Sequence, residues 1–69
     1  MKIVFEIVGR TDEIEYDTSL VSVVPQKGDD VIILLPGEII FYGTVILRTV
    51  DYRGSGVVNI NLKKINSIP

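Results

Sequence analysis

The sequence predicts a small all-β domain of five strands, curled into a partly open barrel, and three observations support this prediction. Val and Ile account for 21 of the 69 residues, and there is no Ala. Branched side chains pack well on a pleated sheet, whereas Ala is the strongest helix former. Short alternating or apolar runs are separated by turn residues. Finally, no apolar pattern has the period and length of a helix.

Composition limits how so short a chain can be stabilised. We assign residues 1–69 to a single domain, close to the lower size limit for independent folding. Cys and His are absent, which excludes disulfides and the usual zinc sites. A very apolar core and self-association remain as the two routes to stability.

The net charge of −2 argues against a general affinity for polyanions. No stretch approaches the ~20 consecutive apolar residues of a membrane helix. Glu6 interrupts the first apolar stretch, which also lacks the small-residue cleavage site of a secretory signal. We therefore expect a cytoplasmic protein with no membrane partner.

The first two strands are predicted to form a hairpin. Residues 2–8 and 13–17 alternate in hydropathy and are joined by the turn sequence of residues 9–12. In the second run Ile14 and Tyr16 are expected to face inward. A looped or single-strand crossing is then expected over Thr18–Lys27, ended by Pro25.

The second half of the chain contains the other three strands. Gly28 provides a tight turn before an apolar strand over residues 30–35, and Pro36-Gly37-Glu38 turns the chain into a long strand over residues 39–50. Gly43 marks a bulge or a bend of this strand. Residues 51–56 form the next turn, and the last strand covers residues 57–64. In the tail, Ile65 or Ile68 is expected to plug an open end of the core.

Regular alternation along these strands predicts which side chains form the core. The expected core residues are Ile3, Phe5, Ile7, Val31, Ile33, Leu35, Val45, Leu47, Val58, Ile60 and Leu62.

One segment resembles a known group of folds. A Gly-Asp pair (Gly28 and Asp29 in PQKGDDVII) opens a strand, PGE forms a turn, and FYGTVILRTVDYRG contains a Gly-x-Val strand. Together with the closing strand VNINL, this resembles SH3-like small barrels, including the Tudor and KOW groups and the short uncharacterised SH3-like proteins of bacterial and phage genomes. The resemblance implies an SH3-like barrel and a phage or mobile-element accessory role. It transfers no functional residue, because the chain lacks Trp and has too few aromatic residues for a peptide groove or an aromatic cage.

The sequence predicts no catalytic residue, no cofactor and no metal site. Asp29 and Asp30 are an adjacent pair of aspartates, but consecutive strand residues point to opposite faces. We interpret Asp29 as a turn cap and Asp30 as solvated. Glu13, Glu15 and Asp17 share one face of a strand, which is the wet side of a hairpin rather than a calcium loop. An enzyme is therefore not expected.

Nucleic-acid binding is the second hypothesis for function. Small barrels commonly bind nucleic acids, and a basic rim with one aromatic residue can be assembled from the last two strands. Its candidate residues are Arg48, Tyr52, Arg53, Lys63 and Lys64. Four cations make a modest groove, and the acidic second strand would oppose a polyanion.

A self-associating, non-enzymatic interaction or assembly module is the leading hypothesis. A small barrel has one core, so the apolar residues on its outer side need a partner, and that partner is expected to be another copy of the chain or a second protein. The predicted self-association surface consists of Val4, Val8, Ile32, Leu34, Ile40, Ile46 and Val57.

Overall fold

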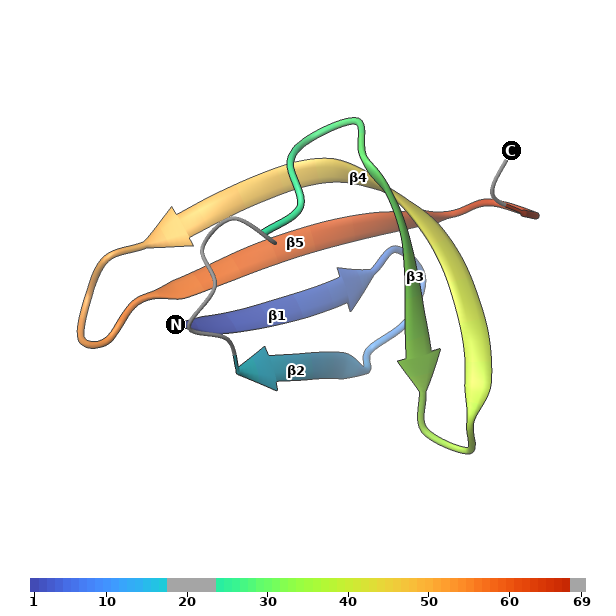
Figure 1. The fold of residues 1–69 in the computed structure, drawn as a ribbon, viewed down its shortest axis with the longest axis horizontal. Coiled ribbons are helices and arrows are strands. Elements are labelled where there is room, and N and C mark those ends of the chain that lie inside the picture. Colours follow the sequence, from blue (N-terminus) through green and yellow to red (C-terminus); the bar gives the residue numbers. More distant parts are fainter. Residues whose placement is uncertain (18–23, 68–69) are drawn as a thin grey trace.

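The computed structural model describes residues 1–17 and 24–67. It contains five strands: β1 (Lys2–Ile7), β2 (Glu13–Asp17), β3 (Asp30–Leu35), β4 (Ile39–Asp51) and β5 (Val57–Lys64). They form one sheet in the order β2-β1-β5-β4-β3, in which only the β1–β5 pair is parallel. Figure 1 shows that β4 bends strongly along its length, so that β3 and the adjoining half of β4 run across the direction of β1 and β2. The predicted all-β, partly open barrel is thus confirmed, with strand limits within one residue of those expected.

The predicted hairpin of β1 and β2 is formed. Ile3 lies opposite Tyr16, and Phe5 lies opposite Ile14. Ile14 is buried, as predicted, whereas Tyr16 remains 40% exposed. The Tyr16 ring still contacts the core, since it meets the ring of Phe5 edge-on with the centroids 5.6 Å apart.

The turn before β3 is closed by Asp29, as the sequence predicted. Its Oδ2 accepts a hydrogen bond of 2.9 Å from the backbone N–H of Gln26. Gly28 has a positive φ of 94°, and its N–H donates to the carbonyl of Val45 at 2.9 Å. The N–H of Val45 in turn donates to the carbonyl of Asp29 at 2.9 Å. These bonds attach the turn to the middle of β4. Residues 18–23 of the predicted crossing lie outside the described residues.

The core fills the concave side of the curled sheet. Nine of the eleven predicted core residues are buried there, and Val31 packs against them at its margin. Val24 and Phe41, which were not predicted, join the cluster. The full buried cluster is Ile3, Phe5, Ile7, Ile14, Val24, Ile33, Leu35, Phe41, Val45, Val58, Ile60 and Leu62.

The prediction that Leu47 belongs to the core is wrong, and a β-bulge is the reason. Val45 pairs with Leu62, but the next pair is Leu47 with Asn61, so Ile46 is an extra residue in β4. One extra residue reverses which side chains face the core. Leu47 therefore lies on the outer face and is 52% exposed.

Gly43 is not the site of this bulge. It lies in continuous pairing between Val31 of β3 and Lys64 of β5. Its buried position lies between two inward side chains, Phe41 and Val45. The missing side chain leaves room for the ring of Phe41, because a Cβ at this position would lie 2.8 Å from Phe41 Cε1.

Candidate functional site

The predicted self-association surface is mostly, but not wholly, exposed. Val8, Ile32, Leu34, Ile40 and Ile46 are all exposed. Val57, a further predicted member, is partly buried.

Val4 is a correction to that surface, because it is only 6% exposed. It lies outside the core cluster, on the other face of the sheet, between Glu15 of β2 and Asn59 of β5. On an interior strand a short side chain is covered by longer cross-strand neighbours. Val4 therefore cannot contribute to a docking surface.

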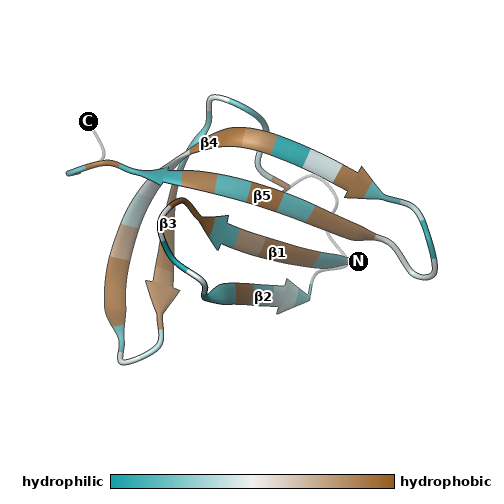
Figure 2. Cartoon of the chain, turned by 180° about the vertical axis from the view of Figure 1, so that it is seen from behind, coloured by the Kyte–Doolittle hydropathy of each residue, from teal (hydrophilic) through white to brown (hydrophobic). Residues whose placement is uncertain are grey.

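The exposed apolar residues concentrate on one hairpin. In the β3–β4 pair, Ile32 lies opposite Tyr42 and Leu34 lies opposite Ile40, so these four side chains share the outer side. Ile32 and Ile40 are each 60% exposed, and Leu34 is 52% exposed. Figure 2 shows the hydrophobic colouring of β3 and of the adjoining part of β4. We call the surface made by Ile32, Leu34, Ile40 and Tyr42 the hairpin face.

The two edges of the sheet differ in chemistry. β2 and β3 each pair with one neighbour only within the described residues. The β2 edge is short and acidic, with Glu13, Glu15 and Asp17 exposed. β3 carries one charge, Asp30, followed by five consecutive apolar residues.

An apolar cleft of about 530 Å³ lies between these edges. Its lining residues are Ile3, Phe5, Tyr16, Asp17, Pro25, Val31, Ile32, Ile33 and Leu34. The barrel is therefore open along a seam whose β3 side is apolar.

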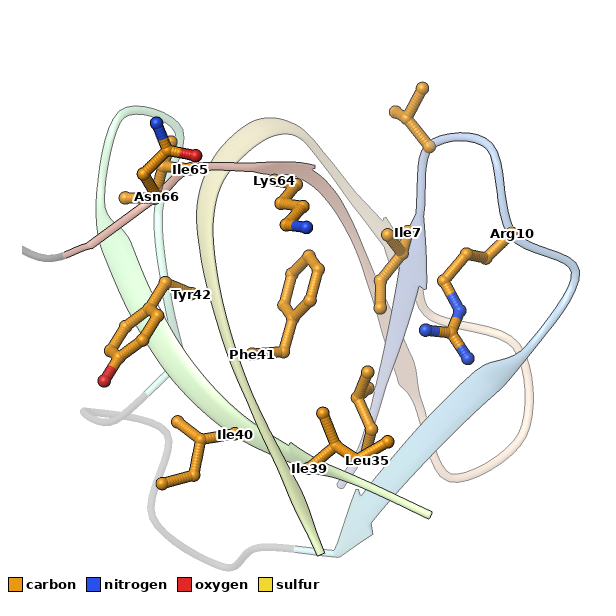
Figure 3. A pocket seen from close by; sticks show the side chains of 11 residues that line it. Ile7, Arg10, Leu35, Ile39, Ile40, Phe41, Tyr42, Lys64, Ile65 and Asn66 are labelled. Carbon is orange, nitrogen blue, oxygen red and sulfur yellow. The ribbon is translucent and has the colours of Figure 1, made fainter. Parts of the chain in front are cut away.

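A second cavity, of about 440 Å³, opens at one end of the barrel. We call it the mouth, and Figure 3 shows its side chains. The buried residues Ile7, Leu35 and Phe41 reach it from three strands, and Arg10 and Lys64 lie at its rim. Ile65 lines the mouth, in line with the prediction that it closes an open end, whereas Ile68 lies outside the described residues. The remaining lining residues are Val8, Ile39, Ile40, Tyr42 and Asn66.

The structure does not gather the predicted nucleic-acid contacts into one groove. Tyr52 and Arg53 lie in the turn before β5, whereas Lys63 and Lys64 end that strand, about 20 Å away at 3.3 Å per residue. Lys63 pairs with Thr44 on the outer face, but Lys64 pairs with Gly43 on the inner face.

Arg48 is also separated from Lys63. It lies opposite the buried Ile60, on the inner side of the sheet, because of the bulge at Ile46. Arg53 is held by Asp51: its Nη2 donates to Asp51 Oδ2 at 2.8 Å and its Nε to Oδ1 at 3.1 Å. This bonding lowers the pKa of Asp51 and raises that of Arg53.

Two features of the mouth were missed by the sequence analysis. Lys64 was treated as part of an outer rim, although it continues the inward series of Val58, Ile60 and Leu62 at intervals of two residues. This alternation was sufficient to predict that Lys64 lies on the inner side of β5. Phe41 lies four residues before Val45, so strand alternation places both side chains on the inner face. Gly43, midway between them, has no side chain, and the alternation was therefore not recognised.

Several of the acidic residues considered for catalysis and metal binding form hydrogen bonds or ion pairs within the fold. Asp29 closes its turn, and Asp30 accepts a hydrogen bond of 2.7 Å from Oγ1 of Thr44. On β2, Glu15 lies 3.6 Å from the ammonium of Lys2. Within residues 1–17 and 24–67, no cluster of three or more acidic side chains could hold a metal ion.

The same described ranges contain no helix that is long and apolar enough to cross a membrane. Comparison of the chain with protein-family models, with curated proteins and with solved structures gives no significant match.

Proposed function

We propose that this chain is a non-enzymatic interaction module that binds a second copy of itself through the hairpin face and the free edge of β3. The observation that supports the proposal most directly is that three large apolar side chains, Ile32, Leu34 and Ile40, lie together at the edge of the sheet and are more than half exposed. A long apolar edge strand is a template for pairing with another chain.

The charges on β3 are compatible with pairing to itself. In an antiparallel β3–β3 pair, Asp30 of one copy would lie near Leu35 of the other. The two Asp30 carboxylates would then be about 17 Å apart, beyond the screening length of ~8 Å at physiological salt. Pairing of β2 with itself would instead bring Glu13, Glu15 and Asp17 of both copies together. β3 is therefore the edge that we assign to association.

The size of the surface indicates a weak dimer. Full burial of a large apolar side chain contributes about 1.5–3 kcal/mol, and these side chains are already partly buried, so each contributes about 1 kcal/mol. Pairing along β3 brings Ile32 and Leu34 of both copies together, and these four side chains offset only the lower end of the ~4–15 kcal/mol that association costs. Backbone hydrogen bonds along β3 have to supply the rest, and we expect the dimer to be populated at high protein concentration.

Light scattering after size exclusion, over a range of loading concentrations, tests the proposal. We expect the mass to rise from 7.7 kDa towards twice that value as concentration increases. The double variant Ile32→Glu/Leu34→Glu should stay at the monomer mass, because it places two charges in the hairpin face of each copy.

The matched control is Thr49→Glu/Asn59→Glu, a cross-strand pair on the outer face of β4 and β5. It adds the same charge away from the hairpin face and should associate like the wild type. Circular dichroism verifies that both variants are folded. A wild-type chain that stays monomeric at high concentration, or a control that dissociates as fully as the hairpin variant, would refute the proposal.

A further inference from the structure

We propose that the mouth is a binding site for a small carboxylate that carries an apolar tail, with Lys64 as the group that holds the carboxylate. This inference does not depend on self-association, since Lys64 and the buried residues that carry it lie outside the hairpin face, although Ile40 and Tyr42 line both surfaces. The volume of about 440 Å³ is within the range of ~300–1,000 Å³ that is typical of small-molecule sites.

The floor of the mouth is apolar, which is why we assign an apolar tail to the ligand. Ile7, Leu35 and Phe41 are buried core residues whose side chains end at this cavity. Val8 and Ile39 extend the apolar surface outward and are each more than half exposed. A ligand chain lying on these five residues would remove them from water.

Lys64 has an unusual position for a lysine. It is the fourth inward residue of β5, after three that are completely buried in the core. Its cross-strand partner is Gly43, which offers no side chain to bond. In Figure 3 its ammonium points into the mouth. The described part of the chain provides this ammonium with neither an ion pair nor a hydrogen bond.

The charge around the mouth selects a monoanion. No acidic side chain is among its eleven lining residues, although the chain as a whole is acidic. Arg10 also lies at the rim, but its Nε and Nη2 both donate to Asp12 Oδ2, which neutralises it. Lys64 is thus the one uncompensated charge of the lining, which matches a single carboxylate better than a phosphate.

A titration of the ¹⁵N-labelled chain with decanoate, kept below its micelle concentration, tests the site by amide chemical shifts. We expect saturable shifts at residues 39–41 and 64–66. Lys64→Met keeps the length of the side chain but removes its charge. It should weaken decanoate binding about fivefold, the upper end of what an exposed ion pair contributes.

Lys63→Met is the matched control, because Lys63 is the neighbouring lysine on the opposite face of the same strand. It should bind decanoate like the wild type. Decanol, which has the tail without the charge, should bind the wild type and Lys64→Met equally. Three results would overturn the inference: no saturable shift, equal decanoate affinity in wild type and Lys64→Met, or shifts centred on Ile32 and Leu34.

Discussion

The ring of Phe41 packs over Gly43, two residues further along the same face of β4. A Cβ at Gly43 would lie 2.8 Å from Cε1 of Phe41 and 3.2 Å from Cβ of Leu62. Both neighbours belong to the packed core, so neither can move without disturbing other contacts. The glycine is therefore required by packing rather than by backbone conformation.

We expect Gly43→Ala to destabilise the fold by about 1–3 kcal/mol through overpacking. Urea unfolding measures this change. The double variant Phe41→Leu/Gly43→Ala should show a coupling between the two sites, since a smaller side chain at 41 removes the clash. A neutral Gly43→Ala would show that the ring does not occupy this space.

The bulge at Ile46 separates two leucines, Leu47 and Leu62, that were both predicted to lie in the core. Their substitutions should therefore differ in their effect on stability. Leu62→Ala should cost about 2–5 kcal/mol because Leu62 is completely buried. Leu47→Ala should cost less than about 1 kcal/mol because Leu47 lies outside, opposite Asn61. Urea unfolding of both variants checks the register, and equal losses would contradict the bulge.

The β3–β4 turn contains a strained residue. Glu38 has a positive φ of 60°, which costs a residue with a side chain about 1–2 kcal/mol. Glu38→Gly relieves this strain, but the greater conformational entropy of glycine stabilises the unfolded chain by about 0.4–1 kcal/mol. We expect a net gain of roughly 0.5–1 kcal/mol in thermal or urea unfolding.

Gly37→Ala, at the preceding position, serves as the control and should have the opposite sign. Its φ is 87°, and a Cβ there would meet only Cδ1 of Ile39 at 3.9 Å. The loss would therefore come from backbone conformation alone. If Glu38→Gly also lowered stability, Glu38 would not be strained in solution.

The Asp51–Arg53 contact predicts that the stability of the fold depends on pH in the acidic range. Hydrogen bonds from the guanidinium, followed by the backbone N–H of Arg53, lower the pKa of Asp51 in the folded chain. Stability from this contact is complete above the pKa of Asp51 in the unfolded chain and is lost as the pH falls through the lower folded value.

NMR titration of the Asp51 carboxyl group measures the shift directly. Arg53→Gln should move the pKa of Asp51 back towards its ordinary value, and Asp51→Asn should remove this part of the acid-dependent loss of stability. An Asp51 carboxyl that titrates alike in the wild type and in Arg53→Gln would show that the contact is not formed in solution.

Much of the fold could be predicted from local sequence. Strand limits, turns and the Asp29 cap follow from alternation and from Gly, Pro and Asp, whose effects extend over a few residues. The hairpin face was also predicted, apart from Tyr42, because alternation is regular along β3 and the first part of β4. The mouth was not predicted as a site, since its residues come from four separate segments of the chain.

The sequence by itself determined that this is a five-stranded all-β domain with more apolar side chains than its core holds. Outside the regular alternation of β3 and the first part of β4, only the tertiary structure decided which of them face outward. The extra residue at Ile46 reversed the faces of Leu47 and Arg48, and the cross-strand neighbours of Val4 covered it. The side of the sheet to which a side chain points depends on the register of its strand with a partner strand that is distant in sequence. A shift of one residue in that register moves inward side chains to the outer face and outward side chains to the core.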